Sequence, residues 1–142
     1  MSDLGLVILD FAGTLYDCGT EGLYEDAERF LAEVHGKIPV SLITLYSPGR
    51  QVLIERLELR RRLDNISIVP EKRPFHFLSD MIKFWVSAEN CLVIGDDEND
   101  ELRMGTLLGC RTLLVNRNGH ESGYPSVANL DEALAYLPLS VR

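Results

Sequence analysis

Long apolar runs and paired cysteines are both missing from this sequence. No stretch approaches the ~18 consecutive apolar residues that a membrane-spanning helix needs, so we expect no membrane span. The segment from Met1 to Gly5 lacks a basic stretch followed by an apolar one, which predicts no secretory signal. The three cysteines, Cys18, Cys91 and Cys110, are odd in number and far apart. This pattern predicts no disulfide framework and favours a reduced, cytoplasmic compartment.

Cations are also scarce: 14 Lys and Arg residues face 22 Asp and Glu residues, for a formal net charge of −8. Such a surface repels phosphate backbones and anionic lipids, so sequence-independent nucleic-acid binding and membrane binding are not expected. A phosphorylated substrate would need a local cation at its site for the same reason. The length of 142 residues, with 46% apolar and 25% charged residues, predicts one globular domain over residues 1–142.

Short apolar runs alternate with longer amphipathic stretches along the chain. The helix expected from Pro74 to about Val86 carries an apolar stripe of Phe77, Leu78, Met81, Ile82 and Trp85. Residues 116–126 are rich in turn formers and predict a loop. The expected strands are 6–9, 40–45, 66–69, 92–94 and 112–115, and the expected helices are 24–35, 48–63, 74–86, 99–108 and 130–137. This alternation predicts an α/β fold, a Rossmann-like doubly wound parallel sheet of about five strands.

Polar side chains follow several of these strands. Asp10, Thr44 and Asp96 come at strand ends, and Lys72 follows the third strand after a short loop. Doubly wound sheets bind ligands at the carboxyl ends of their strands, where the strand order reverses. Two acids, a hydroxyl and an amine are therefore expected at one sheet edge.

Asp10 ends the first expected strand and has two interpretations. Its carboxylate can act as a nucleophile towards phosphorus and form an acyl phosphate. Alternatively it caps the following turn through a side-chain to backbone hydrogen bond, which Asp does often. The residue alone does not separate the two.

Acids are concentrated in the segment 95–100 (GDDEND). Carboxylates in one short loop repel one another unless a cation lies among them, and Mg²⁺ prefers such oxygen ligands. Interaction with a helix dipole explains one or two acids, at about 0.3–1 kcal/mol each, but explains the whole group poorly. The segment therefore favours metal binding.

These residues together resemble the four ordered motifs of the haloacid dehalogenase (HAD) superfamily. The segments 10–15 (DFAGTL) and 95–100 resemble the specific first and fourth motifs, whereas Thr44 and Lys72 match looser ones mainly by position. The resemblance spans residues 6 to about 116. Ser47 competes with Thr44 for its role, and Arg73 competes with Lys72.

The resemblance implies roles for the residues of these motifs. Asp10 would be the nucleophile, on a strand next to that of Asp96. A Mg²⁺ ion would be held by Asp10, the carbonyl of Ala12, Asp96 and Asp100, with Asp97 as the alternative to Asp100.

The phosphoryl group would have its own set of contacts in this resemblance. The side chains of Thr44 and Lys72 would hold it, together with the backbone of Phe11 and Ala12.

One position departs from the phosphatase pattern. Where phosphatases of this superfamily have a second Asp, which protonates the leaving group, this chain has Ala12. General acid–base assistance is typically worth about 10²–10⁴-fold, so its loss matters most for poor leaving groups. Asp17 could replace the acid, but a role in a turn is favoured.

The chain also leaves little room for a cap domain. This argues against a phosphonatase, because enzymes of that kind use a lysine from the cap domain. A capless site resembles those of enzymes that act on large phosphorylated substrates or use a second subunit as a lid.

We therefore expect a Mg²⁺-dependent phosphohydrolase or phosphotransferase that favours good leaving groups. The alternative is a catalytically weak regulatory module that binds phosphate and Mg²⁺. A dehalogenase, which needs an enclosed apolar pocket and no metal, fits less well.

Overall fold

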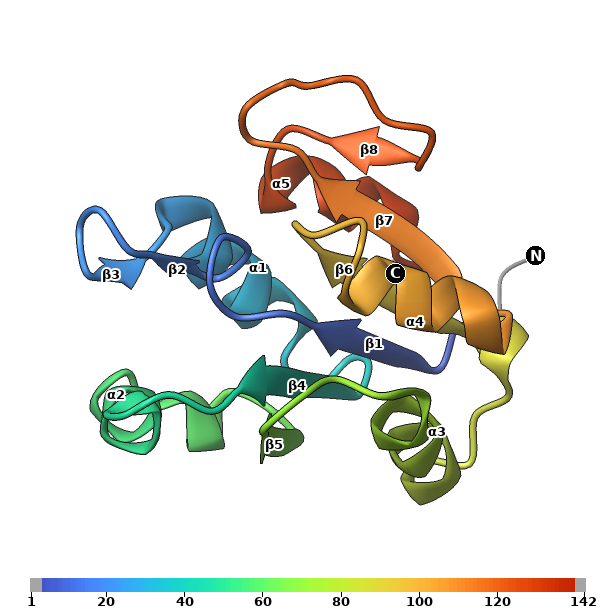
Figure 1. The fold of residues 1–142 in the computed structure, drawn as a ribbon, viewed down its shortest axis with the longest axis horizontal. Coiled ribbons are helices and arrows are strands. Elements are labelled where there is room, and N and C mark those ends of the chain that lie inside the picture. Colours follow the sequence, from blue (N-terminus) through green and yellow to red (C-terminus); the bar gives the residue numbers. More distant parts are fainter. Residues whose placement is uncertain (1–3, 140–142) are drawn as a thin grey trace.

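A computed structural model describes residues 4–139 of the chain, so residues 1–3 and 140–142 of the expected domain lie outside the described part. The described residues form a six-stranded parallel sheet in the order β5-β4-β1-β6-β7-β8, with helices on both faces (Figure 1). The α/β prediction is confirmed. The strands are β1 (Leu6–Leu9), β4 (Val40–Leu45), β5 (Asn65–Val69), β6 (Cys91–Gly95), β7 (Arg111–Val115) and β8 (Ser126–Val127).

Five helices and a small hairpin complete the described fold. The antiparallel hairpin of β2 and β3 follows β1 and lies beyond its carboxyl end (Figure 1). Short 3₁₀ turns cover Leu59–Arg61, Ala88–Asn90 and Leu134–Tyr136. The remaining elements are β2 (Tyr16–Asp17), β3 (Gly22–Leu23), α1 (Glu25–Val34), α2 (Arg50–Arg56), α3 (Pro74–Lys83), α4 (Glu101–Leu108) and α5 (Leu130–Ala133).

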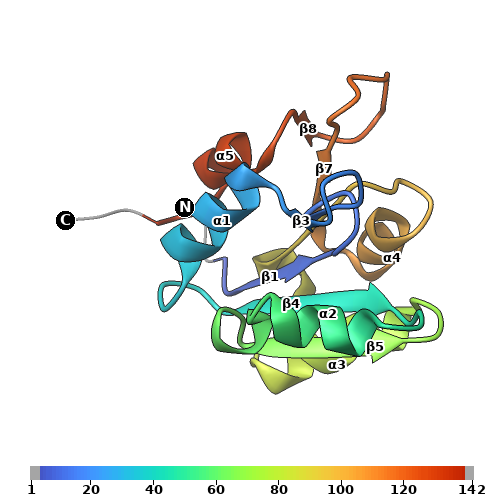
Figure 2. The ribbon, with the colours of Figure 1, turned by 90° about the vertical axis from the view of Figure 1, so that its left-hand side faces the viewer.

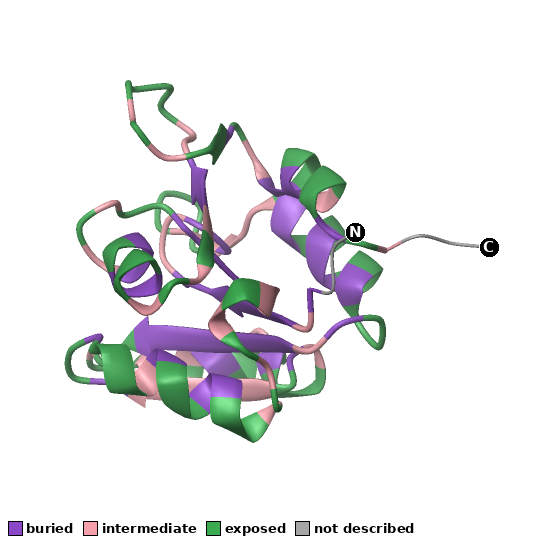
Figure 3. Ribbon diagram, turned by 90° about the vertical axis from the view of Figure 1, so that its right-hand side faces the viewer, coloured by how far each residue is buried: buried purple, intermediate pink, exposed green. Residues whose placement is uncertain are grey.

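Strand β1 is buried along its whole length because both of its faces are covered. Val7 and Leu9 pack into the core on the side of α1 and α5, and Leu6 and Ile8 pack into the core on the side of α3 and α4. Successive side chains of a strand point to opposite faces, so a doubly covered strand reads as a continuous apolar run. The purple strands between green outer helix surfaces in Figure 3 show this layering.

Strand pairing brings the ends of four strands to one edge. Leu9 of β1 lies opposite Ile94 of β6 and opposite Leu42 of β4. Strand β5 continues the sheet beyond β4, as the side view also shows (Figure 2). The chain order runs outward from β1 through β4 and β5 on one side and through β6 to β8 on the other. The reversal therefore lies between β1 and β6, where ligand sites of such sheets are found.

The prediction of a helix over 74–86 is wrong about where the helix ends and about which of its residues are buried. It ends at Lys83, and Trp85 adopts a left-handed backbone with φ of 57° and is 95% exposed. Leu78 and Ile82 are also exposed, so only Phe77 and Met81 of the expected stripe are buried.

The inward face of α3 instead includes a carboxylate. Asp80 is buried, and it accepts hydrogen bonds from Ser41 (2.5 Å) and Asn65 (3.2 Å) on the sheet. An apolar stripe was therefore the wrong criterion for this helix, because a satisfied polar group occupies part of its packed face.

Two other boundaries differ from the expected ones. The helix expected at 48–63 is divided, because Glu58 takes a left-handed conformation (φ 56°) between α2 and the 3₁₀ turn. Strand β8 adds a sixth strand at the end of the loop expected over 116–126. Among the described residues, no element forms a cap domain over the sheet edge, and no helix is long and apolar enough to cross a membrane.

Candidate active site

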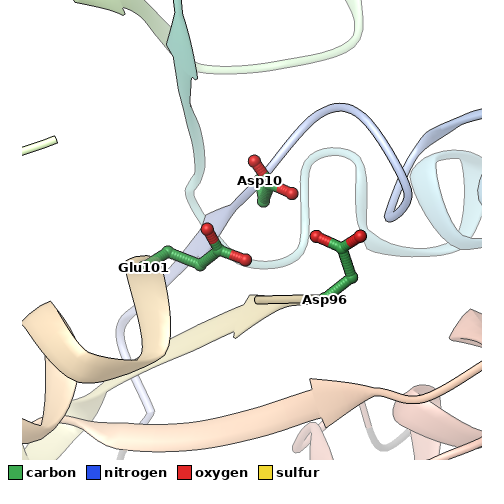
Figure 4. Close-up of side chains that lie close together, drawn as sticks. All are labelled: Asp10, Asp96 and Glu101. Carbon is green, nitrogen blue, oxygen red and sulfur yellow. The ribbon is translucent and has the colours of Figure 1, made fainter. Parts of the chain in front are cut away.

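Three carboxylates converge at the edge between β1 and β6. Asp10 follows β1, Asp96 follows β6, and Glu101 lies in the first turn of α4. One oxygen from each lies within 4.8 Å of the others, and Figure 4 shows the three groups pointing toward a common centre. Three carboxylates at this separation form an oxygen-rich site of the kind that hard divalent cations prefer.

Lys72 is buried against these acids. Its Nζ donates to Oδ1 of Asp10 (2.6 Å) and to Oε1 of Glu101 (3.0 Å), and lies 3.7 Å from Oδ2 of Asp100. Burial alone would lower the pKa of Lys72, but the carboxylates of Asp10 and Glu101 raise it above its ordinary value. The ammonium group therefore stays charged next to Asp10.

Two of the acids have raised pKa values because the carboxylates lie close together and are partly buried. Desolvation and the nearby carboxylate of Asp10 raise the pKa of Asp96 to about 8. Burial and Asp10 likewise raise the pKa of Glu101 to about 7, against the opposing effect of Lys72. A cation among these groups would favour their charged forms.

Two glycines allow this close approach. A Cβ atom at Gly13 would lie 1.9 Å from Oδ2 of Asp96, and Gly13 has a left-handed φ of 82°. A Cβ atom at Gly95 would lie 2.1 Å from Oε2 of Glu101. Each acid thus occupies space that a side chain at the facing glycine would fill.

The loop after β1 is fixed by Arg117, which follows β7. Its guanidinium donates to the carbonyl oxygens of Gly13 (3.2 Å) and Thr14 (2.8 Å) and forms a bidentate pair with Asp26 (3.1 and 2.9 Å). It also lies 3.5 Å from the ring centroid of Tyr24. The hydroxyl of Thr14 in turn donates to Oδ2 of Asp10 (3.3 Å).

On the other side of Asp10 lies a hydroxyl with a second cation. The buried hydroxyl of Thr44 accepts a hydrogen bond from Nη1 of Arg50, which also donates to the carbonyl of Leu45 (3.1 Å). A cavity of about 250 Å³ is lined by Asp10, Ala12, Thr44, Leu45, Arg50, Lys72, Asp96, Asp97, Asp100 and Glu101. This cavity thus contains two cations among its carboxylates, with Lys72 in direct contact with Asp10.

The competing residues have contacts of their own, although Asp97 also lines the cavity. Arg73 pairs with Glu71 at the surface (3.2 Å), and Ser47 is partly exposed in the loop before α2. The carboxylate of Asp97 accepts from its own loop, from the amide of Asn99 (2.9 Å). Asp17 accepts from the amide of Gly19 (2.9 Å), the turn role that the sequence favours.

Phe11, expected to contribute its backbone, has a fully buried ring that stacks on Tyr16.

Sequence reasoning missed three residues of the site, Glu101, Arg50 and Arg117. Glu101 lies near the start of the expected helix 99–108, just outside the acidic segment 95–100, and a side chain in the first turn of a helix can point back over the strand end. Arg50 follows a Pro-Gly pair just beyond the expected strand 40–45, and this position was its available signal. Arg117 carried none, because its partner Asp26 is distant in sequence.

Comparison with known proteins identifies the fold. No protein-family model and no curated protein matches this sequence. Solved structures do: a HAD phosphatase from Thermococcus onnurineus matches with a TM-score of 0.81 and 12% identity, over 94% of this chain and 98% of that one. A 2-haloacid dehalogenase from Pseudomonas syringae pv. Tomato DC3000 matches with a TM-score of 0.77 and 13% identity, over 94% and 99%.

A haloacid dehalogenase-like family hydrolase from Xanthomonas campestris matches with a TM-score of 0.70 and 18% identity, over 81% of this chain. The matched region spans only 53% of the Xanthomonas protein. These likenesses show that the described residues have the fold of the HAD core. Since phosphatases and dehalogenases share that fold, the chemistry must be argued from the site.

Proposed function

We propose that this chain, which has the HAD core fold, is a Mg²⁺-dependent phosphohydrolase or phosphotransferase with Asp10 as its nucleophile. The observation that carries the proposal is the pairing of Asp10 with the buried ammonium of Lys72 at 2.6 Å, in a cavity with other carboxylates and Thr44. A nucleophile for phosphorus needs a cation beside it to hold the anionic group that it attacks.

A divalent ion fits the residues present. Asp10, Asp96 and Glu101 supply three oxygen ligands, and the space opposite Gly13 and Gly95 is filled by two of these acids. Ala12 and Asp100 line the same cavity, and the carbonyl of Ala12 and the carboxylate of Asp100 would be further ligands, as the resemblance implies. When bound, the ion would offset the negative charge of substrate and carboxylates.

The residues of the chain would then divide the work as follows. A carboxylate oxygen of Asp10 attacks phosphorus, the bond to the leaving-group oxygen breaks, and that oxygen takes a proton from solvent. Lys72 and Thr44 hold oxygens of the phosphoryl group during the transfer, with the backbone of Phe11 and Ala12 beside them. Water then attacks phosphorus, which releases phosphate and a proton and restores the carboxylate.

Ala12 limits which substrates react. Its methyl group can neither donate nor accept a proton, so no side chain at this position assists the leaving group. Aryl and acyl phosphates, whose leaving groups need little protonation, are therefore the favoured substrates. With no cap domain among the described residues, the site would accept a large phosphorylated substrate or be covered by a second subunit.

A second candidate function is a regulatory module that binds phosphate and Mg²⁺ with little turnover. Ala12 favours it, because no side chain at this position assists a leaving group. Turnover separates the two functions.

The test is phosphate release from phenyl phosphate with and without Mg²⁺. We expect Mg²⁺-dependent release that Asp10→Asn abolishes and the control Asp17→Asn leaves intact. Binding of orthophosphate without any release would favour the regulatory module. Release that persists in Asp10→Asn would contradict the role of the nucleophile.

A further inference from the structure

Arg50 is the second cation of the cavity, and nothing in the proposed chemistry requires it. Its side chain is held in place by three contacts: with the hydroxyl of Thr44, with the carbonyl of Leu45, and with the ring of Phe11, whose centroid lies 4.8 Å from Cζ. Each of these partners is uncharged. The guanidinium is thus positioned at the cavity without being neutralised.

Among residues 4–139, no carboxylate lies within ion-pair distance of Arg50. Arg29, Arg60, Arg61 and Arg62, by contrast, each pair with an acid. A fixed guanidinium without a direct carboxylate partner favours an anion at its own edge of the cavity, whereas the five carboxylates of the same cavity favour a cation.

The free edge of Arg50 has the geometry for such a ligand. Its hydrogen bonds use Nη1, which leaves the edge formed by Nε and Nη2. Arg29 uses this same edge to hold Asp131, with distances of 3.1 Å from Nε and 2.8 Å from Nη2. Two parallel donors of this kind match the two oxygens of a carboxylate or a phosphate.

Lys72 and Arg50 differ in how far they are buried, and this difference suits them to different roles. Lys72 is only 4% exposed and touches Asp10, whereas Arg50 is partly exposed and reaches the site through Thr44. A phosphoryl group held by Lys72 and Thr44 would therefore have Arg50 beside its outer part.

We propose that Arg50 binds a second anionic group of the substrate, a carboxylate or phosphate carried next to the transferred phosphoryl group. The proposal rests on the proposed function and narrows its substrate class to phosphorylated compounds that carry a second anionic group near the transferred phosphoryl group. Arg50 is then a specificity residue at the rim of the site.

The experiment is calorimetric binding with Mg²⁺ present, because binding needs no turnover. Methylphosphonate carries the phosphoryl mimic alone, and phosphonoacetate and 3-phosphonopropionate add a carboxylate at two distances. Methylenebisphosphonate carries a second phosphoryl group instead and separates the two sources of the anion. We expect the wild-type protein to prefer at least one of the doubly anionic ligands over methylphosphonate by about tenfold to hundredfold.

Variants assign the preference to one side chain. Arg50→Gln should remove it, and Arg50→Lys should keep only part, because a lysine cannot form the parallel pair. The matched control is Arg56→Gln, which makes the same charge change at an exposed position of the same helix α2, outside the cavity. It should keep the wild-type preference, and thermal unfolding of each variant verifies its fold.

The outcomes separate this proposal from the proposed function. No preference in the wild-type protein, or an equal loss for all ligands in Arg50→Gln, would overturn the role of Arg50. An equal loss of preference in Arg56→Gln would assign the effect to net charge and overturn it as well. A preference that depends on Arg50, in a protein that releases no phosphate from any ester, would support this proposal and overturn the proposed catalysis.

Discussion

At the scale of single residues, the proposed preference for good leaving groups depends on Ala12. Replacing it by Asp would add a carboxyl group to the cavity that already contains Asp10 and Lys72. We expect Ala12→Asp to raise the rate on an alkyl phosphate by about 10-fold or more, within the range of general acid–base assistance, and to change the rate on an aryl phosphate much less. Steady-state rates on the two esters measure this.

The control for this substitution is Ala12→Asn, which has nearly the same size as Asp but cannot exchange a proton in the same way. It should give no gain on the alkyl ester. Equal rates on both esters, unchanged in Ala12→Asp, would contradict the role given to position 12.

The raised pKa of Glu101 predicts how the stability of the metal-free protein depends on pH. Burial and Asp10 raise its pKa in the folded state to about 7, whereas the unfolded chain releases the proton near the ordinary value of 4.5. The folded state therefore binds more protons than the unfolded state between these values. Its stability should fall as the pH rises through this window, the reverse of a salt-bridged acid with a lowered pKa.

The measurement is thermal unfolding in EDTA over a pH series. Glu101→Gln should flatten the decline, because glutamine has no proton to lose, and Mg²⁺ should restore stability at the high end of the window. An unchanged pH profile in Glu101→Gln would show that this group does not cause the decline.

At the scale of elements, Arg117 joins segments that are far apart in sequence. It connects the loop after β1, the start of α1 and, through Asp26, the amide of Leu130 at the start of α5. The side chains of Arg117 and Asp26 are only 20% and 12% exposed, and Arg117 lowers the pKa of Asp26 against the opposing effect of burial. Arg117 and Asp26 thus connect the loop that carries Gly13 to α1 and α5.

Arg117→Gln should destabilise the protein by about 3 kcal/mol, because it leaves Asp26 partly buried without its cation. Urea unfolding measures the loss. The matched control is Arg29→Gln, which removes an exposed pair with Asp131 and should change the stability much less. Equal costs for the two variants would mean that the Arg117 pair behaves as an ordinary surface contact.

The outer side of α3 is exposed, and so is the residue Trp85 that follows the helix. Trp85 is the only tryptophan of the chain and is 95% exposed just after α3. Its fluorescence should therefore resemble that of free tryptophan, with full quenching by acrylamide. A blue-shifted, protected emission in dilute solution would contradict the exposed placement.

At the scale of the whole molecule, the alternation of strands and helices was sufficient to predict the fold. The five expected strands are all present, and the two central ones, β1 and β6, are short apolar runs that are buried along their whole length. Strand β8 has only two residues and pairs at the edge of the sheet, so periodicity could not reveal it.

The site was predictable where it depends on strand ends and not where it depends on helix direction. Asp10 and Asp96 follow neighbouring strands, and the structure brings them together with Lys72. Glu101 was missed because its approach depends on the orientation of α4. Asp80 was missed on the buried face of α3 because its partners, Ser41 and Asn65, come from other elements.

The central claim is that Asp10 accepts a phosphoryl group in a site that needs a divalent cation. Fluoroberyllate, a mimic of a phosphoryl group on a carboxylate, tests it most directly by fluorine NMR of the protein. We expect a bound signal in the wild-type protein that requires Mg²⁺ and is absent in Asp10→Asn. A signal that survives in Asp10→Asn, or no bound signal at saturating Mg²⁺ in the wild-type protein, would contradict the claim.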